Sequence, residues 1–149
     1  MSTITTSPRP AEPIVWPQPE RAAAFEQWLV AQASAHRLLP ATVRAASADA
    51  SFRRYFRVDT QQGGACIIMD APPAQENCEP FVRIAGLLQE AGLLVPRILA
   101  WDQAQGFMLL DDLGTDTMMV AIQPEQAQVN LKLYVRATDA LLQLQQQAN

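Results

Sequence analysis

The stretch Ser51-Phe-Arg-Arg-Tyr-Phe-Arg-Val58 alternates between two kinds of side chain and predicts a half-buried β-strand. Successive side chains of a strand point to opposite faces, so the exterior face would carry Arg53, Tyr55 and Arg57. The inward face would carry Phe52, Arg54, Phe56 and Val58. An inward arginine needs a partner, because an unpaired buried charge is strongly destabilising. For Arg54 we consider a ligand phosphate, a carboxylate of the protein, or a stem that reaches the rim.

The sequence on both sides of this strand indicates an α+β fold. Strand-like segments cover residues 42–46, 66–69, 95–100 and 107–110. Amphipathic helices are expected over about 20–39, from Glu79 to near Gly92, and over about 124–147. Because hairpin-linked strands pair antiparallel, we expect an antiparallel five-stranded sheet with flanking helices that cover one side of it.

The composition narrows the possible partners and compartments. A net charge of −4 argues against nucleic acid or an anionic membrane as a partner. Residues 1–19 are rich in proline and lack an apolar core, which predicts a flexible N-terminus and no secretory signal. Cys66 and Cys78 have no metal-ligand spacing, so we expect a cytoplasmic protein with free thiols. Lys132 is the only lysine and His36 the only histidine, which restricts any catalytic hypothesis.

Two segments between the predicted strands could bind a nucleotide. The small-residue turn Ser47-Ala48-Asp49-Ala50-Ser51 would let backbone amides approach a polyphosphate, and Ser51 could add a hydroxyl. A plain hairpin turn has the same composition. The stretch Leu109-Leu-Asp-Asp-Leu-Gly114 is typical of a hinge whose backbone can bond an adenine edge, or of a surface loop after an edge strand.

The order of these motifs resembles the N-terminal lobe of the aminoglycoside phosphotransferase and choline kinase superfamily, which has a protein-kinase-like fold. Within it, Ala50-Ser-Phe-Arg-Arg-Tyr-Phe-Arg57 and Met69-Asp-Ala-Pro-Pro73 are similar to the bacterial anomeric kinases of N-acetylmuramate and N-acetylglucosamine. The resemblance implies a kinase-like N-lobe over 20–110. It implies the hinge and first helix of a truncated C-lobe over 111–149.

The resemblance also implies roles for single residues. Residues Ser47, Ala48, Asp49, Ala50 and Ser51 would form the loop above the triphosphate, and Asp111, Asp112 and Leu113 the hinge that meets adenine. Met69 falls at or beside the position where such kinases place a phosphate-binding lysine. We therefore expect Arg54 to supply the missing charge, or phosphate binding to be weak. Glu76 or Glu79 would engage an arginine, or would be a solvated carboxylate at a helix N-terminus.

The catalytic segment of the superfamily, His-Gly-Asp, does not occur in this sequence. His36 is followed by Arg37 and Leu38, so we assign no catalytic residue and no metal ligand. The leading hypothesis is the ATP-binding lobe of an amino-sugar kinase of cell-wall recycling, inactive alone and using ATP with Mg²⁺. The second is a non-catalytic binding or regulatory module that forms a homodimer through its exposed last helix. The third is an unrelated α+β domain whose arginines bind another anion.

Overall fold

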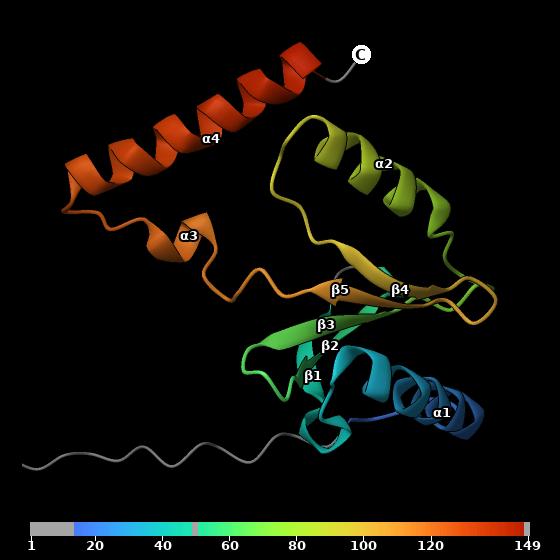
Figure 1. The fold of residues 1–149 in the computed structure, drawn as a ribbon. Coiled ribbons are helices and arrows are strands. Elements are labelled where there is room, and N and C mark those ends of the chain that lie inside the picture. Colours follow the sequence, from blue (N-terminus) through green and yellow to red (C-terminus); the bar gives the residue numbers. More distant parts are fainter. Residues whose placement is uncertain (1–13, 49–50, 148–149) are drawn as a thin grey trace, which may run out of the picture.

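A five-stranded antiparallel sheet forms the centre of the molecule (Figure 1). The computed structural model describes residues 14–48 and 51–147. The strand order is β1-β2-β3-β5-β4, and all four neighbouring pairs are antiparallel. The strands are β1 (Arg44–Ala48), β2 (Arg54–Asp59), β3 (Ala65–Asp70), β4 (Ile98–Asp102) and β5 (Phe107–Asp111). The expected α+β class and antiparallel five-stranded sheet are confirmed.

The strand that contains Tyr55 is shorter than its alternating pattern suggests. β2 begins at Arg54, which pairs with Asp70 at the last position of β3. Phe52 lies before the ladder and is 61% exposed, so the prediction that it faces inward was wrong. The physical reason is that β3 ends opposite Arg54, and Phe52 has no strand partner there to hold it on the core face.

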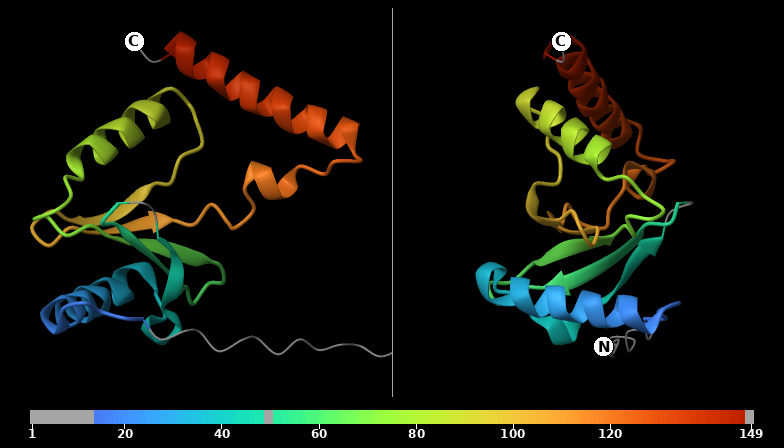
Figure 2. Two further views of the ribbon diagram at one scale, coloured as in Figure 1. Left: turned by 180° about the vertical axis from the view of Figure 1, so that it is seen from behind. Right: turned by 90° about the vertical axis from the view of Figure 1, so that its right-hand side faces the viewer.

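Helix α1 (Pro19–His36) covers one face of the sheet (Figure 2). Phe25, Trp28 and Leu29 recur at helical spacing and are buried. They pack against β-strand residues Phe56, Val58, Ile68, Phe107 and Leu109. At about 1.5–3 kcal/mol for each fully buried large apolar side chain, this contact is a main source of stability. Arg37 ends the helix in a left-handed conformation with φ of 54°.

The segment before α1 belongs to the core. The Trp16 ring lies 5.0 Å from that of Phe25 and 5.5 Å from that of Phe56. Ile14 packs against the same cluster. The expected flexible N-terminus covers residues 1–19, and within it Ile14 and Trp16 pack against this cluster. Residues 1–13 lie outside the described part.

Helix α2 (Glu79–Glu90) lies on the opposite face of the sheet. Its Phe81 and Val82 pack against a second cluster that includes Met69 and Met108. The expectation that the helices share one side was wrong, since β-strands present apolar residues on both faces and each face needs a cover. The predicted start of this helix at Glu79 is observed, and Gly92 follows it with φ of +76°.

The last predicted helix divides into two. A one-turn helix α3 (Met118–Ala121) precedes α4 (Ala127–Gln147), and Pro124 lies between them instead of starting the helix. In helix α4, Gln143 donates to the carbonyl of Ala91 at 2.8 Å, and Asn130 donates to the carbonyl of Gln123 at 2.6 Å. A short 3-10 turn (Pro40–Thr42) precedes β1. In the described residues, no helix has both the length and the apolar content needed to cross a membrane.

Candidate functional site

A cavity of about 500 Å³ lies on the α2 side of the sheet, between β1 and the segment that follows β5. It brings Ser47 of the predicted phosphate turn together with Asp111, Asp112 and Leu113 of the predicted hinge. The remaining lining residues are Ala46, Tyr55, Arg57, Ile67, Phe81, Pro96, Leu110, Gly114, Thr115 and Thr117. Two segments that are far apart in the sequence therefore face one space.

The wall of this cavity is apolar. Ile67 of β3 and Leu110 of β5 are register partners, so their side chains lie side by side on this face. Phe81 of α2 and Pro96 complete the wall. Apolar walls beside a few polar groups are typical of a pocket for a flat organic ring.

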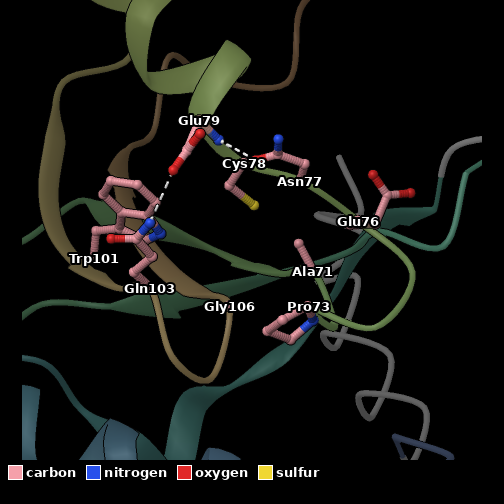
Figure 3. A pocket seen from close by; sticks show the side chains of 9 residues that line it. All are labelled: Ala71, Pro73, Glu76, Asn77, Cys78, Glu79, Trp101, Gln103 and Gly106. Carbon is pink, nitrogen blue, oxygen red and sulfur yellow. Dashed lines mark hydrogen bonds between the residues drawn. The ribbon is translucent and has the colours of Figure 1, made fainter.

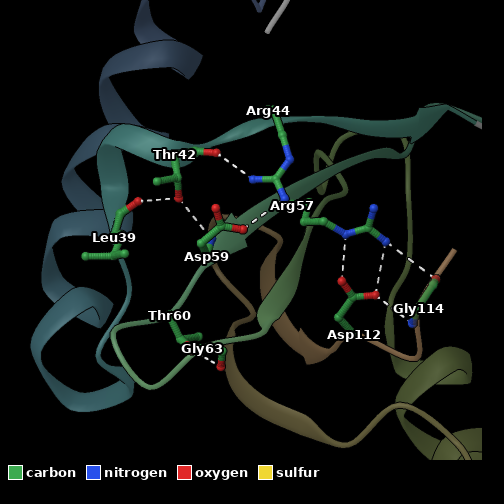
Figure 4. Close-up of polar contacts among 9 residues, drawn as sticks. All are labelled: Leu39, Thr42, Arg44, Arg57, Asp59, Thr60, Gly63, Asp112 and Gly114. Atoms are coloured by element: carbon green, nitrogen blue, oxygen red, sulfur yellow. Dashed lines mark hydrogen bonds and ion pairs between the residues drawn. The ribbon is translucent and has the colours of Figure 1, made fainter. Parts of the chain in front are cut away.

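An ion pair joins β2 to Asp112 of the predicted hinge at the edge of the cavity (Figure 4). Arg57 donates from Nε to Asp112 Oδ2 at 2.6 Å and from Nη2 to Asp112 Oδ1 at 3.1 Å. The hydrogen bond from Arg57 holds the pKa of Asp112 below its ordinary value, against the opposing effect of partial burial. The sequence placed Arg57 only on an exterior face. No local pattern indicated its partner, because Asp112 lies 55 residues further along the chain.

The neighbouring carboxylate has a partner of its own. Arg97 donates from Nε to Asp111 Oδ2 at 2.5 Å and from Nη2 to Oδ1 at 3.2 Å. The hydrogen bond from Arg97 lowers the pKa of Asp111. Arg97 is 67% exposed and does not line the cavity. Both carboxylates of the predicted hinge are thus paired with arginines, Arg57 of β2 and Arg97 just before β4.

The predicted phosphate turn is only partly described. Ser47 lies at the cavity and pairs with Tyr55 across β1 and β2. The hydroxyl of Ser51 accepts a hydrogen bond from the Arg53 backbone N–H at 3.1 Å, and Ser51 does not line the cavity. Ala48 ends β1, while Asp49 and Ala50 lie outside the described residues.

Arg54 lies on the α1 face of the sheet, opposite the cavity. It donates to Asp70 Oδ2 from Nε at 3.0 Å and from Nη2 at 2.5 Å. The other oxygen of Asp70 accepts from Arg21 of α1 at 2.5 and 3.0 Å. Asp70 is fully buried. Of the alternatives considered for the inward arginine, the structure shows pairing with a carboxylate of the protein. Arg54 is therefore not part of the site proposed below.

Met69 is also fully buried, in the cluster between the sheet and α2, and does not line the cavity. An apolar side chain thus lies at or beside the position where the resemblance places a lysine. No cation is contributed to the cavity from this position.

Glu76 and Glu79 line a separate, smaller cavity of about 190 Å³ near the start of α2 (Figure 3). Glu76 accepts from Arg53 Nε at 3.1 Å and from the Phe52 backbone N–H at 3.0 Å, so it engages an arginine as the sequence suggested. Partial burial lowers the pKa of Arg53, but hydrogen bonds with Tyr55 and Glu76 and the nearby charges raise it overall. Glu79 instead accepts from Gln103 at 3.2 Å.

Potential metal ligands and thiols are the remaining groups of catalytic interest. Over 14–48 and 51–147, no group of three or more His, Cys, Asp or Glu side chains could hold a metal ion. Cys66 and Cys78 are free and buried, and burial raises the pKa of both thiols.

Comparison with known families matches residues 42–149 to the phosphotransferase enzyme family. The chain belongs to this family, and its sheet and flanking helices correspond to a kinase-like N-lobe. The predicted resemblance to the aminoglycoside phosphotransferases is thereby confirmed.

Three curated proteins of one name are similar to this chain. The chain is 52% identical over 108 residues to the N-acetylmuramate/N-acetylglucosamine kinase of Pseudomonas aeruginosa. It is 51% identical over 104 residues to the kinase of that name in Pseudomonas putida, and 38% over 101 residues to that of Neisseria meningitidis. These matches cover 71%, 70% and 67% of this chain, but only 30% of each relative. The chain thus spans less than a third of the curated relatives it matches.

Proposed function

We propose that this chain is the ATP-binding lobe of an amino-sugar kinase that acts in the cytoplasmic recycling of cell-wall sugars. The observation that carries the proposal is the single cavity that contains both Ser47 and residues 111–113. The relatives named for N-acetylmuramate and N-acetylglucosamine support the choice of an amino sugar as the acceptor. The acceptor would be bound outside this lobe.

The cavity supports a specific orientation for the nucleotide. The base would lie against the apolar side chains of Ile67 and Leu110, with its polar edge toward the hinge backbone at 111–113. The phosphates would extend toward Ser47 and the turn at 47–51. ATP bound there would supply the phosphoryl group, and Mg²⁺ would be bound together with its phosphates.

The charge of the site predicts weak phosphate binding. Among the described residues that line the cavity, Arg57 is the one cation, and Asp112 already neutralises it. Backbone amides of the turn would then be the main contacts to phosphate oxygens. Most of the affinity should therefore come from the base.

Filling the cavity should weaken this binding. Ala46→Trp places an indole in the cavity that Ala46 lines, and should weaken binding of a non-hydrolysable ATP analogue at least about tenfold, or about 1.4 kcal/mol. Isothermal titration calorimetry measures the dissociation constant. The matched control is Ala45→Trp, at an exposed neighbour on β1 that does not line the cavity, which should change it less than about twofold. No binding by the wild-type chain, or an equal loss in both variants, would count against the site.

We expect residues 1–149 alone to catalyse no phosphoryl transfer. The single histidine, His36, is the last residue of α1, on the opposite side of the sheet from the cavity. Release of ADP above background when the chain is mixed with ATP, Mg²⁺ and N-acetylglucosamine would contradict this part of the proposal.

A second candidate function is a non-catalytic binding or regulatory module that dimerises through α4. The exposed apolar side chains of this helix favour it: Val129, Leu131, Tyr134, Val135, Leu141 and Leu142. None of the 21 residues of this amphipathic helix is buried, and an exposed apolar face of this kind is typical of a protein–protein interaction surface. A dimer in solution is the result that this candidate requires.

A further inference from the structure

We propose that Arg57 is a positioning residue, whose ion pair with Asp112 fixes the hinge in the conformation that receives the nucleotide base. This inference rests on the proposed nucleotide site. The pair joins β2 to the segment after β5, although β3 lies between these two strands in the sheet. Arg57 therefore reaches across β3 to Asp112. Ordering such a long side chain costs conformational entropy, which the two hydrogen bonds to Asp112 offset.

The same guanidinium organises the backbone beyond Asp112. Asp112 Oδ1 accepts both from Arg57 Nη2 and from the Gly114 backbone N–H at 2.9 Å. Arg57 Nη2 also lies 3.5 Å from the Gly114 carbonyl oxygen. Gly114 has φ of +96°, a conformation that side-chain-bearing residues rarely adopt. Arg57 thus holds the Asp112 carboxylate and contacts the Gly114 carbonyl, while Asp112 holds the Gly114 amide.

Partial burial makes this pair stronger than a typical surface pair. The side chains of Arg57 and Asp112 are 19% and 11% exposed, against 67% and 25% for Arg97 and Asp111. Water screens an exposed pair, and such pairs contribute little to stability. Both residues of the Arg57–Asp112 pair line the cavity, whereas Arg97 of the other pair does not. A change in the geometry of the Arg57–Asp112 pair would therefore reach a ligand in the cavity directly.

A positioning role and a phosphate-binding role predict different ligand dependence. The donors of Arg57 are directed at the hinge, so losing them should disturb the base site regardless of how many phosphates the ligand carries. If Arg57 instead bound a phosphate of the nucleotide, its loss would weaken the binding of ATP and leave the binding of adenosine unchanged. Adenosine and a non-hydrolysable ATP analogue are therefore the probes.

The test compares Arg57→Met, Asp112→Asn, their double variant and the control Arg97→Met, which removes the adjacent exposed pair. We expect Arg57→Met and Asp112→Asn each to weaken both ligands about tenfold by calorimetry, with the double variant no weaker than either single one. Arg97→Met should stay within about twofold of wild type. Arg57→Lys, which keeps the charge but loses the planar fork, should fall between wild type and Arg57→Met.

Amide hydrogen exchange provides a readout that needs no ligand. The amides of residues 112–114 should exchange faster in Arg57→Met than in wild type. Their exchange rates should be unchanged in Arg97→Met. A loss of ATP affinity alone, equal effects of Arg57→Met and Arg97→Met, or unchanged exchange at 112–114 would each overturn the inference. If the wild-type chain binds neither ligand, the nucleotide proposal fails, and the exchange measurement still decides whether Arg57 fixes the hinge.

Discussion

At the scale of single residues, the most constrained group is the carboxylate of Asp70. It is fully buried between Arg21 of α1 and Arg54 of β2, and each oxygen accepts from one guanidinium. Arg21 lies 3.9 Å from the centre of the Phe107 ring, and Arg54 lies 4.2 Å from that of Trp16. Two cations stacked on aromatic rings thus compensate a charge that would otherwise be costly to bury. The triad links the N-terminal segment, α1 and the sheet.

Removing one of these cations should affect stability and leave the proposed site intact. Arg54→Met should lower the free energy of unfolding by about 3 kcal/mol, the lower end for breaking a buried pair, because Arg21 keeps one oxygen of Asp70 satisfied. Urea denaturation measures this change. The control Arg44→Met removes the exposed pair with Asp59 and should cost less than about 1 kcal/mol. If Arg54→Met instead reduced nucleotide affinity at unchanged stability, the phosphate interpretation of Arg54 would return.

At the scale of elements, the turn between β4 and β5 depends on Gly106. Its φ is +72°, and a Cβ at this position would lie 2.0 Å from the carbonyl oxygen of Ala71. That close approach lets the Gly106 carbonyl accept from the Ala71 N–H at 2.9 Å, which ties the turn to the end of β3. Gly86, in α2, is the opposite case, because nothing lies within 4 Å of its Cβ position.

Alanine at these two glycines should therefore shift stability in opposite directions. Gly106→Ala should reduce the free energy of unfolding by at least about 3 kcal/mol, through both the clash and the positive φ. Gly86→Ala should raise it by about 0.5–1 kcal/mol, because alanine is the better helix former. Chemical denaturation of both variants checks the contrast. A tolerated Gly106→Ala would show that the contact between this turn and Ala71 is not formed in solution.

At the scale of the whole molecule, the two faces of the sheet are unequally covered. The α1 face holds the large aromatic and aliphatic cluster, whereas α2 and α4 have no fully buried residue. In Figure 2, α4 lies beside α2 and away from the sheet. The exposed apolar side chains of α4 are thus available to another surface.

The oligomeric state distinguishes the two candidate functions at this scale. If the second candidate is right, light scattering after size exclusion should give twice the mass of the chain. Tyr134→Glu with Leu141→Glu should then restore the monomer, since residues seven apart share a helix face. Val30→Glu, at an exposed apolar position of α1, is the control and should leave the dimer intact. A monomer at all concentrations in the wild type would eliminate the dimeric module.

The sequence by itself determined the type and order of the main elements, the antiparallel sheet and the family. Alternation along 54–58 and the helical spacing of Phe25, Trp28 and Leu29 are local patterns, and local patterns dictate which side of an element is buried. They also located Ser47 and residues 111–113, which the structure brings to one cavity.

Only the tertiary structure decided which residues became partners. Arg54 and Arg57 lie three residues apart on one strand, yet opposite faces of the sheet direct one to Asp70 and the other to Asp112. No local pattern encodes this, because the partner depends on strand order and register across the sheet. The side of the sheet that α2 occupies, and the packing of Trp16 into the core, were decided in the same way, by contacts between segments distant in sequence.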